Sequence, residues 1–177
     1  MSYFAAAVIR DGDEWSASEI SLADAADIED VADRLRDVKP EADISLLFVE
    51  SDDAYLVILR LDQGEDLRVF GSDVAFAEES RLGTLLLGDI GEPVVELAAA
   101  ELQAAEVVSE SADASSEPAA PTDADPVGDT DLLADLGVPA TRLLEWCGHE
   151  GMLPSDITAQ VCQALGCGDE VEELREA

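Results

Sequence analysis

One segment of this chain, Ser109–Val127, cannot contribute to a hydrophobic core. It reads SESADASSEPAAPTDADPV, contains no aromatic residue and no Lys or Arg, and has Val127 as its only large apolar residue. Such a composition buries too little apolar surface to offset the entropy that is lost on ordering. We therefore expect a disordered acidic linker over residues 109–127, with one folded part at 1–108 and a second at 128–177.

Acidic residues are spread over the whole chain. The 42 Asp and Glu against 9 Lys and Arg give a formal net charge of −33. Residues 1–108 carry 26 acids and 7 bases, the linker 5 and 0, and residues 128–177 carry 11 and 2. Direct binding to nucleic acid or to an anionic membrane is disfavoured, because both need clustered basic residues. A basic protein partner would be attracted, although solubility alone also accounts for such a charge.

The chain has the features expected of a cytoplasmic protein. The apolar run near its start, Phe4–Ile9, is too short for a signal peptide and has no preceding basic residue. No segment approaches the ~20 apolar residues of a membrane span. The 3 cysteines are an odd number and do not form a disulfide framework.

The first part is predicted to be an antiparallel α+β domain, in which two strands, a helix and three strands (ββαβββ) precede further helices. The helix carries Ile28, Val31, Ala32, Leu35 and Val38 on one face, and its start is placed at the capping-box-like Ser21–Asp24. The predicted strands are Tyr3–Arg10, Glu14–Ile20, Ile44–Glu50, Ala54–Leu61 and Leu67–Phe70, and the helices after them are 73–90 and 93–108.

Two of these strands need cover on both faces. The runs ISLLFV (44–49) and AYLVIL (54–59) lack alternation between apolar and polar residues. The predicted helix covers one face of the sheet. Residues 73–90, a second copy of the chain in a homodimer, or another protein would cover the other, and we expect cover from within the chain because large apolar patches are rare on monomers.

The second part, 128–177, is predicted to be a small helical bundle. Its short amphipathic helices are expected at Thr130–Leu136, Ala140–His149, Ser155–Leu165 and Asp169–Arg175, with glycines at the positions of C-terminal caps. A bundle of about 50 residues is marginally stable alone. It would therefore dock on the first part or on a partner.

A zinc site is suggested by four residues that lie within 21 positions of one another: Cys147, His149, Cys162 and Cys167. Their spacings, C-x-H and C-x₄-C, differ from those of zinc knuckles, and free cysteine is a common small core residue. Acidic pairs such as Asp52–Asp53 carry no specificity in so acidic a chain. No nucleotide-binding or hydrolase motif is present. We assign no catalytic, cofactor-binding or metal residue and predict a protein that is not an enzyme.

Several motifs resemble one family. They are SYFAAAV (2–8), RVFGSD (68–73), DLLADLG (131–137), LLEWC (143–147), GMLPSD (151–156) and ALGCGDEVEEL (164–174). They are similar to the actinobacterial tRNA adenosine deaminase-associated proteins, and they lie on both sides of the linker. The deaminase itself uses H-x-E and P-C-x-x-C to hold zinc and to transfer the proton, and this chain lacks both motifs. The name of the family comes from gene neighbourhood with that enzyme, so the resemblance carries no functional residues with it.

Three functions remain open from the sequence. The first is an acidic adaptor that binds a basic protein, with a tRNA adenosine deaminase or another tRNA-handling protein as the candidate partner. The second is an inhibitor that mimics nucleic acid, in which carboxylates would stand in rows at the spacing of phosphates. The third is a small metal-binding protein that uses Cys147, His149, Cys162 and Cys167.

Overall fold

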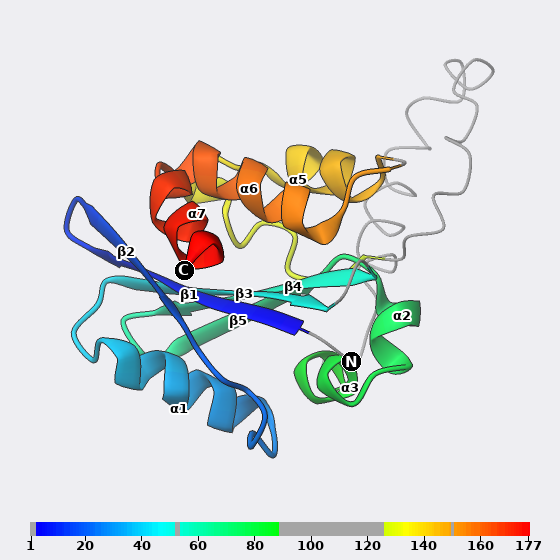
Figure 1. Cartoon of the computed structure of the whole chain (residues 1–177), viewed down its shortest axis with the longest axis horizontal. Helices are drawn as coiled ribbons and strands as arrows, with labels where there is room; N and C mark the ends of the chain where they lie inside the picture. Colours follow the sequence, from blue (N-terminus) through cyan, green and yellow to red (C-terminus); the bar gives the residue numbers. More distant parts are fainter. Residues whose placement is uncertain (1–2, 52–53, 89–125, 150) are drawn as a thin grey trace, which may run out of the picture.

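The chain folds around one antiparallel sheet with helices on both faces (Figure 1). The computed structural model describes residues 3–51, 54–88, 126–149 and 151–177. The predicted helix at 93–108 and residues 109–125 of the predicted linker lie outside these ranges. The α+β class and the antiparallel sheet of the N-terminal part are as predicted.

The sheet has six strands in the order β2-β1-β3-β4-β5-β6. The strands are β1 (Tyr3–Asp11), β2 (Glu14–Glu19), β3 (Ile44–Ser51), β4 (Tyr55–Asp62), β5 (Asp66–Gly71) and β6 (Val127–Gly128). The first five match the predicted strands to within two residues at each end. β6 was not predicted: Val127 pairs with Gly71, so the last residue of the predicted linker belongs to the sheet.

Helix α1 (Ile28–Val38) covers part of one sheet face and buries Val31, Ala32 and Leu35. The prediction that it starts at Ser21–Asp24 is wrong. Asp27 is the N-cap, and its side chain accepts a hydrogen bond from the Asp30 amide (2.9 Å). The Asp30 carboxylate in turn accepts a hydrogen bond from the Ala26 amide (2.9 Å). The two aspartates therefore provide acceptors for two backbone amides at the start of the helix.

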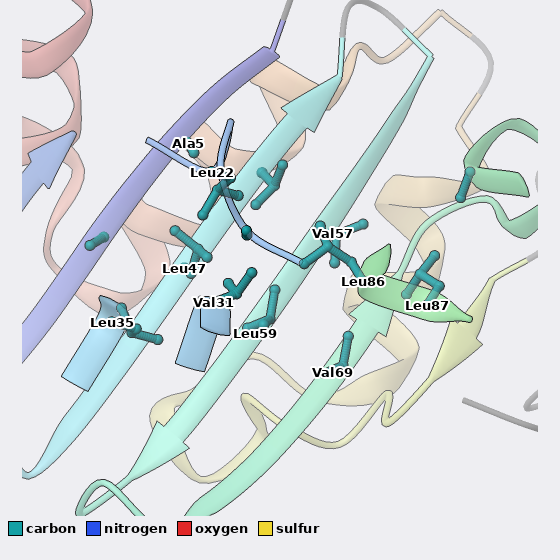
Figure 2. Close-up of a cluster of buried hydrophobic side chains, with 14 of the residues drawn as sticks. Ala5, Leu22, Val31, Leu35, Leu47, Val57, Leu59, Val69, Leu86 and Leu87 are labelled. Carbon is teal, nitrogen blue, oxygen red and sulfur yellow. The ribbon is translucent and has the colours of Figure 1, made fainter. Parts of the chain in front are cut away.

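The helices that follow β5 pack on the same face as α1. They are α2 (Val74–Glu78) and α3 (Arg81–Leu87), and the Ser80 side chain caps α3. Gly83 allows their close approach, because a Cβ there would lie 2.2 Å from the Ala77 carbonyl oxygen. Figure 2 shows the resulting core, in which side chains from α1 and α3 gather over the strands.

The opposite face is covered by the C-terminal segment, whose elements are η1 (Ala134–Leu136), α5 (Ala140–Cys147), α6 (Pro154–Leu165) and α7 (Gly168–Glu176). This corrects the assignment of residues 73–90 to the second face. Phe48 and Ile58 of the sheet share one core with Leu143 and Val161 of the helices. Cover from within the chain is thus present, and it comes from the C-terminal helices.

The predicted helix at Thr130–Leu136 is instead a turn followed by the single 3₁₀ turn η1. The Leu132 carbonyl accepts a hydrogen bond from the Arg60 guanidinium, and this interaction holds the segment on the sheet. Gly137 adopts a φ of 104°, which ends η1 in the left-handed region and turns the chain toward α5. The other three C-terminal helices lie where they were predicted.

Candidate protein-interaction surface

The basic side chains of the chain are almost all engaged within the molecule. Eight of the 9 pair with a carboxylate, donate to a backbone carbonyl or lie over an aromatic ring: Arg10, Arg34, Arg36, Lys39, Arg60, Arg68, Arg142 and Arg175. Carboxylates of the same molecule offset the charge of five of them: Arg36, Lys39, Arg60, Arg68 and Arg175. The exposed surface is left dominated by carboxylates.

Arg60 is the most deeply buried of these basic residues, with 4% of its surface exposed. It extends from β4 toward η1, where its guanidinium donates to the Leu132 carbonyl and to the Asp135 carboxylate, and it also bonds Asp62 on its own strand. The hydrogen bond from Arg60 is the largest cause that lowers the pKa of Asp135. The pKa of Arg60 is raised in return. This group ties the C-terminal segment to the sheet.

A second polar tie joins β3 to α7. Glu50 is 7% exposed and pairs with Arg175, whose guanidinium also lies over the Phe4 ring at 5.2 Å. Burial raises the pKa of the Glu50 carboxyl, and the neighbouring Thr158 and Arg175 only partly offset that effect. The two ties therefore hold carboxylates whose pKa values move in opposite directions.

Glu50 should make stability depend on pH with a sign opposite to that of Asp135. Its raised folded-state pKa means that its contribution is fully present below the unfolded pKa and is lost as the pH rises through the folded pKa. The contribution of Asp135, whose folded pKa is lowered, is present above the unfolded pKa and is lost as the pH falls. In urea unfolding at a series of pH values, the free energy of unfolding of Glu50→Gln should rise relative to that of the wild type between about pH 4 and 7. The stability of Asp135→Asn should fall relative to that of the wild type in a lower window, as the pH rises toward about 5, because the unfolded pKa of Asp is about 3.9. Parallel profiles for Glu50→Gln and the wild type would contradict this assignment.

The cysteines and the histidine considered for zinc are not gathered into a ligand set. Cys162 and Cys167 are buried beside each other at the α6–α7 junction, whereas His149 is exposed after α5. Burial raises the pKa of the Cys147 thiol to about 12. Within the described part of the chain, no three His, Cys, Asp or Glu side chains lie close enough to hold a metal ion. These thiols are core residues in this fold.

A pocket of about 190 Å³ lies on the opposite side of the sheet, between the β2–α1 connection and α3. Its walls include Tyr3, Leu22, Leu85 and the buried Ser51 and Ser80. Among the residues that line it, Tyr3 and Arg81 carry the ionisable side chains. The pocket therefore lacks the paired acid and base that general acid–base chemistry uses.

Exposed carboxylates occur over the whole described surface, and α1 and α7, which lie on opposite faces of the sheet, carry four each (Figure 1). The exposed acids of α1 are Glu29, Asp30, Asp33 and Asp37, and those of α7 are Asp169, Glu172, Glu173 and Glu176. Asp30 accepts a hydrogen bond at the start of α1, and Asp33 pairs with Arg36. Among the described residues, the other six acids make no such hydrogen bond or ion pair. The sequence predicted this surface from charge alone, without locating it.

The sequence analysis did not predict the bonds of Arg60 to the C-terminal segment or the pair between Glu50 and Arg175. The sequence held a signal for Arg60, because this residue interrupts the apolar strand that runs from residue 55 to 61. A charged residue on a strand buried on both faces needs a partner from a covering element. Nothing local to Glu50 or Arg175 indicated their pairing, because they are 125 residues apart.

The fold and the surface define an α+β protein whose exposed charged side chains are mostly carboxylates. A model of the Rv3753c-like tRNA adenosine deaminase-associated protein family matches residues 3–168, and the chain belongs to that family. The match extends over the sheet and most of its C-terminal cover. No curated protein and no solved structure matches the chain. Among the helices that the structure describes, none combines the length and apolar character needed to cross a bilayer.

Proposed function

We propose that this chain is a non-enzymatic accessory protein that binds a tRNA adenosine deaminase through its acidic surface. The observation that carries the proposal is the distribution of charge: carboxylates of α1 and α7 are exposed, while eight of the 9 basic residues are engaged within the chain. The family description, which names association with a tRNA adenosine deaminase, supports this choice of partner. Because that enzyme acts on tRNA, we place the complex in the cytoplasm.

A tRNA-binding protein presents basic side chains for the phosphate backbone. An acidic protein is attracted to the same kind of surface, and its association is accelerated and oriented by the complementary field. Such an interface should weaken as salt rises, since exposed charges are screened within about 8 Å at physiological ionic strength. The salt dependence therefore separates this mode of binding from a purely apolar one.

The test is binding of the purified deaminase to the full chain, by calorimetry or pull-down at 50 and 200 mM salt. A neutralised variant carries Glu29→Gln, Asp37→Asn, Glu173→Gln and Glu176→Gln. Loss of four such charges should weaken binding about tenfold or more, since rim charges contribute about 0.2–1 kcal/mol each. The matched control removes four exposed acids elsewhere, in Glu65→Gln, Asp66→Asn, Glu78→Gln and Glu79→Gln, and should stay within about threefold.

No complex at either salt concentration would refute the proposal. Equal weakening by both variants would show that only net charge matters and that α1 and α7 are not the contact surface. Added tRNA addresses the nucleic-acid mimic, the alternative raised by the acidity. If the fraction of chain released equals the fraction of enzyme that has bound tRNA, the chain acts as a mimic that blocks the RNA site. If the enzyme, the tRNA and the chain form a ternary complex, the chain acts as an adaptor.

A further inference from the structure

The sheet ends at one side in a strand that has no neighbour among the described residues. β2 pairs with β1 through the register Ala6↔Glu19 to Asp11↔Glu14, and it is the outermost strand on that side. Figure 1 shows it at the margin of the sheet, with α7 over one face. An unpaired strand edge presents a row of N–H and C=O groups that can pair with another strand.

The outward-pointing groups follow from the hydrogen-bond pattern. The Ile20 amide donates to the Ala5 carbonyl (3.0 Å), and this pair continues the β1–β2 register by one residue beyond Ala6↔Glu19. In an antiparallel pair, hydrogen-bonded and non-hydrogen-bonded positions alternate. Ser18 and Ser16 therefore bond β1, whereas the N–H and C=O of Trp15, Ala17 and Glu19 point away from the sheet. These three residues form the free edge.

The surroundings of the free edge are acidic. Glu14 and Glu19 are exposed at the two ends of β2, and Asp13 is exposed in the turn before it. α7, with its exposed carboxylates, packs on β2 and β1. The end of α1 reaches the β1–β2 turn, where Lys39 pairs with Asp11 and the Gly12 amide donates to Asp43 (3.0 Å).

We propose that the free edge of β2 is the docking site for an extended, basic segment of the partner protein, which joins the sheet as an additional antiparallel or parallel strand. The inference rests on the proposed function and specifies its geometry. Backbone hydrogen bonds to Trp15, Ala17 and Glu19 supply the pairing. Lys or Arg at alternate positions of the segment reach the acids of α7, because alternate side chains of a strand share one face.

Charge selects this occupant over a second copy of the chain. Two β2 edges brought together would place Glu14 and Glu19 of each copy near those of the other, within molecules that each carry a net charge of −33. Like charges that face each other across strands are destabilising. A basic segment removes that repulsion and uses the same backbone groups.

Ala17→Pro tests the edge directly. Proline removes the outward N–H of Ala17 and places its ring at the edge, but it takes no hydrogen bond from the β1–β2 ladder, because proline is tolerated where the N–H faces solvent. We expect the circular dichroism to be retained and deaminase binding to fall at least tenfold. Ala17→Ser keeps the N–H, changes the same side chain and should bind as the wild type does.

Hydrogen exchange measured by NMR provides a readout that does not require a variant. In the free full-length protein, the amides of Trp15, Ala17 and Glu19 should exchange much faster than those of Ser16 and Ser18. Addition of the deaminase should slow the first three by tenfold or more. This measurement remains decisive if Ala17→Pro does not fold.

The two proposals fail in different ways. If the wild-type chain does not bind the deaminase, the proposed function is wrong. If it binds, but Ala17→Pro binds equally well and the edge amides gain no protection, the docking inference alone is overturned. Light scattering of the chain alone covers the other occupant: a wild-type dimer that Ala17→Pro converts to a monomer would assign the edge to a second copy and overturn the inference.

Discussion

Replacing Phe48 by alanine is expected to lower the free energy of unfolding by about 3–5 kcal/mol, which is the range for a large aromatic side chain in a packed core. Phe48 is fully buried on β3 and belongs to the core between the sheet and the C-terminal helices. The loss would approach the whole stability of a typical domain. Urea unfolding at neutral pH measures it directly.

Leu47→Ala is the matched control for this prediction. Leu47 is the next residue on the same strand, is equally buried, and points into the other core, with Val31 and Leu59 (Figure 2). It should destabilise by about 2–5 kcal/mol. The two variants differ in their effect on fluorescence. Both tryptophans of the chain, Trp15 and Trp146, pack against the core that contains Phe48.

The tryptophan emission of folded Phe48→Ala should therefore shift to the red below its unfolding transition, whereas that of folded Leu47→Ala should match the wild type. An equal shift in both variants would show that the two cores are not separate. No loss of stability in Phe48→Ala would show that the C-terminal helices do not pack on the sheet as described.

The strands were predictable because their sequence pattern and turns are local. Asp11-Gly12-Asp13 marks the first hairpin, and Gly12 adopts a φ of 63°, as such a turn requires. The absence of alternation in β3 also predicted correctly that both sheet faces are covered. The identity of the cover was not predictable, since residues 73–90 and the C-terminal segments were all predicted to be helical and either could serve.

The miss at the start of α1 has a similar cause. Ser21–Asp24 and Asp27–Asp30 both have the spacing of a capping box, and one sequence does not choose between them. The structure uses the second because Leu22 and Ala25 are buried in the core, which keeps the first stretch out of the helix. Tertiary packing decided between two locally equivalent starts.

The candidate surface was predictable in its sign and not in its position. A net charge of −33 indicated an acidic exterior, but charge that is spread over the whole chain does not locate a contact surface. The free edge of β2 depends on strand order, which is set by contacts that are distant in the sequence. β1 lies between β2 and β3 although a helix separates it from β3 along the chain.

Arg60→Met is expected to lower the free energy of unfolding by about 2 kcal/mol, because it leaves the buried Leu132 carbonyl without its donor. Methionine retains most of the aliphatic stem, so packing is largely kept. The two carboxylate partners, Asp135 and Asp62, are 58% and 23% exposed at their side chains and can be rehydrated, which keeps the loss below that of a fully buried pair. The effect should centre on the attachment of η1 to the sheet.

Arg68→Met provides the control, because Arg68 lies directly opposite Arg60 on β5 and therefore on the same face of the sheet. Its side chain is 45% exposed, and its pair with Asp129 spans 3.9 Å. Its loss should cost less than about 0.5 kcal/mol. Urea unfolding and limited proteolysis of the C-terminal helices should therefore separate the two arginines. Equal losses would mean that position on the sheet, and not the bond to the Leu132 carbonyl, gives Arg60 its effect. A larger loss at Arg60 alone would identify the buried guanidinium as the polar anchor that holds the C-terminal cover on the sheet.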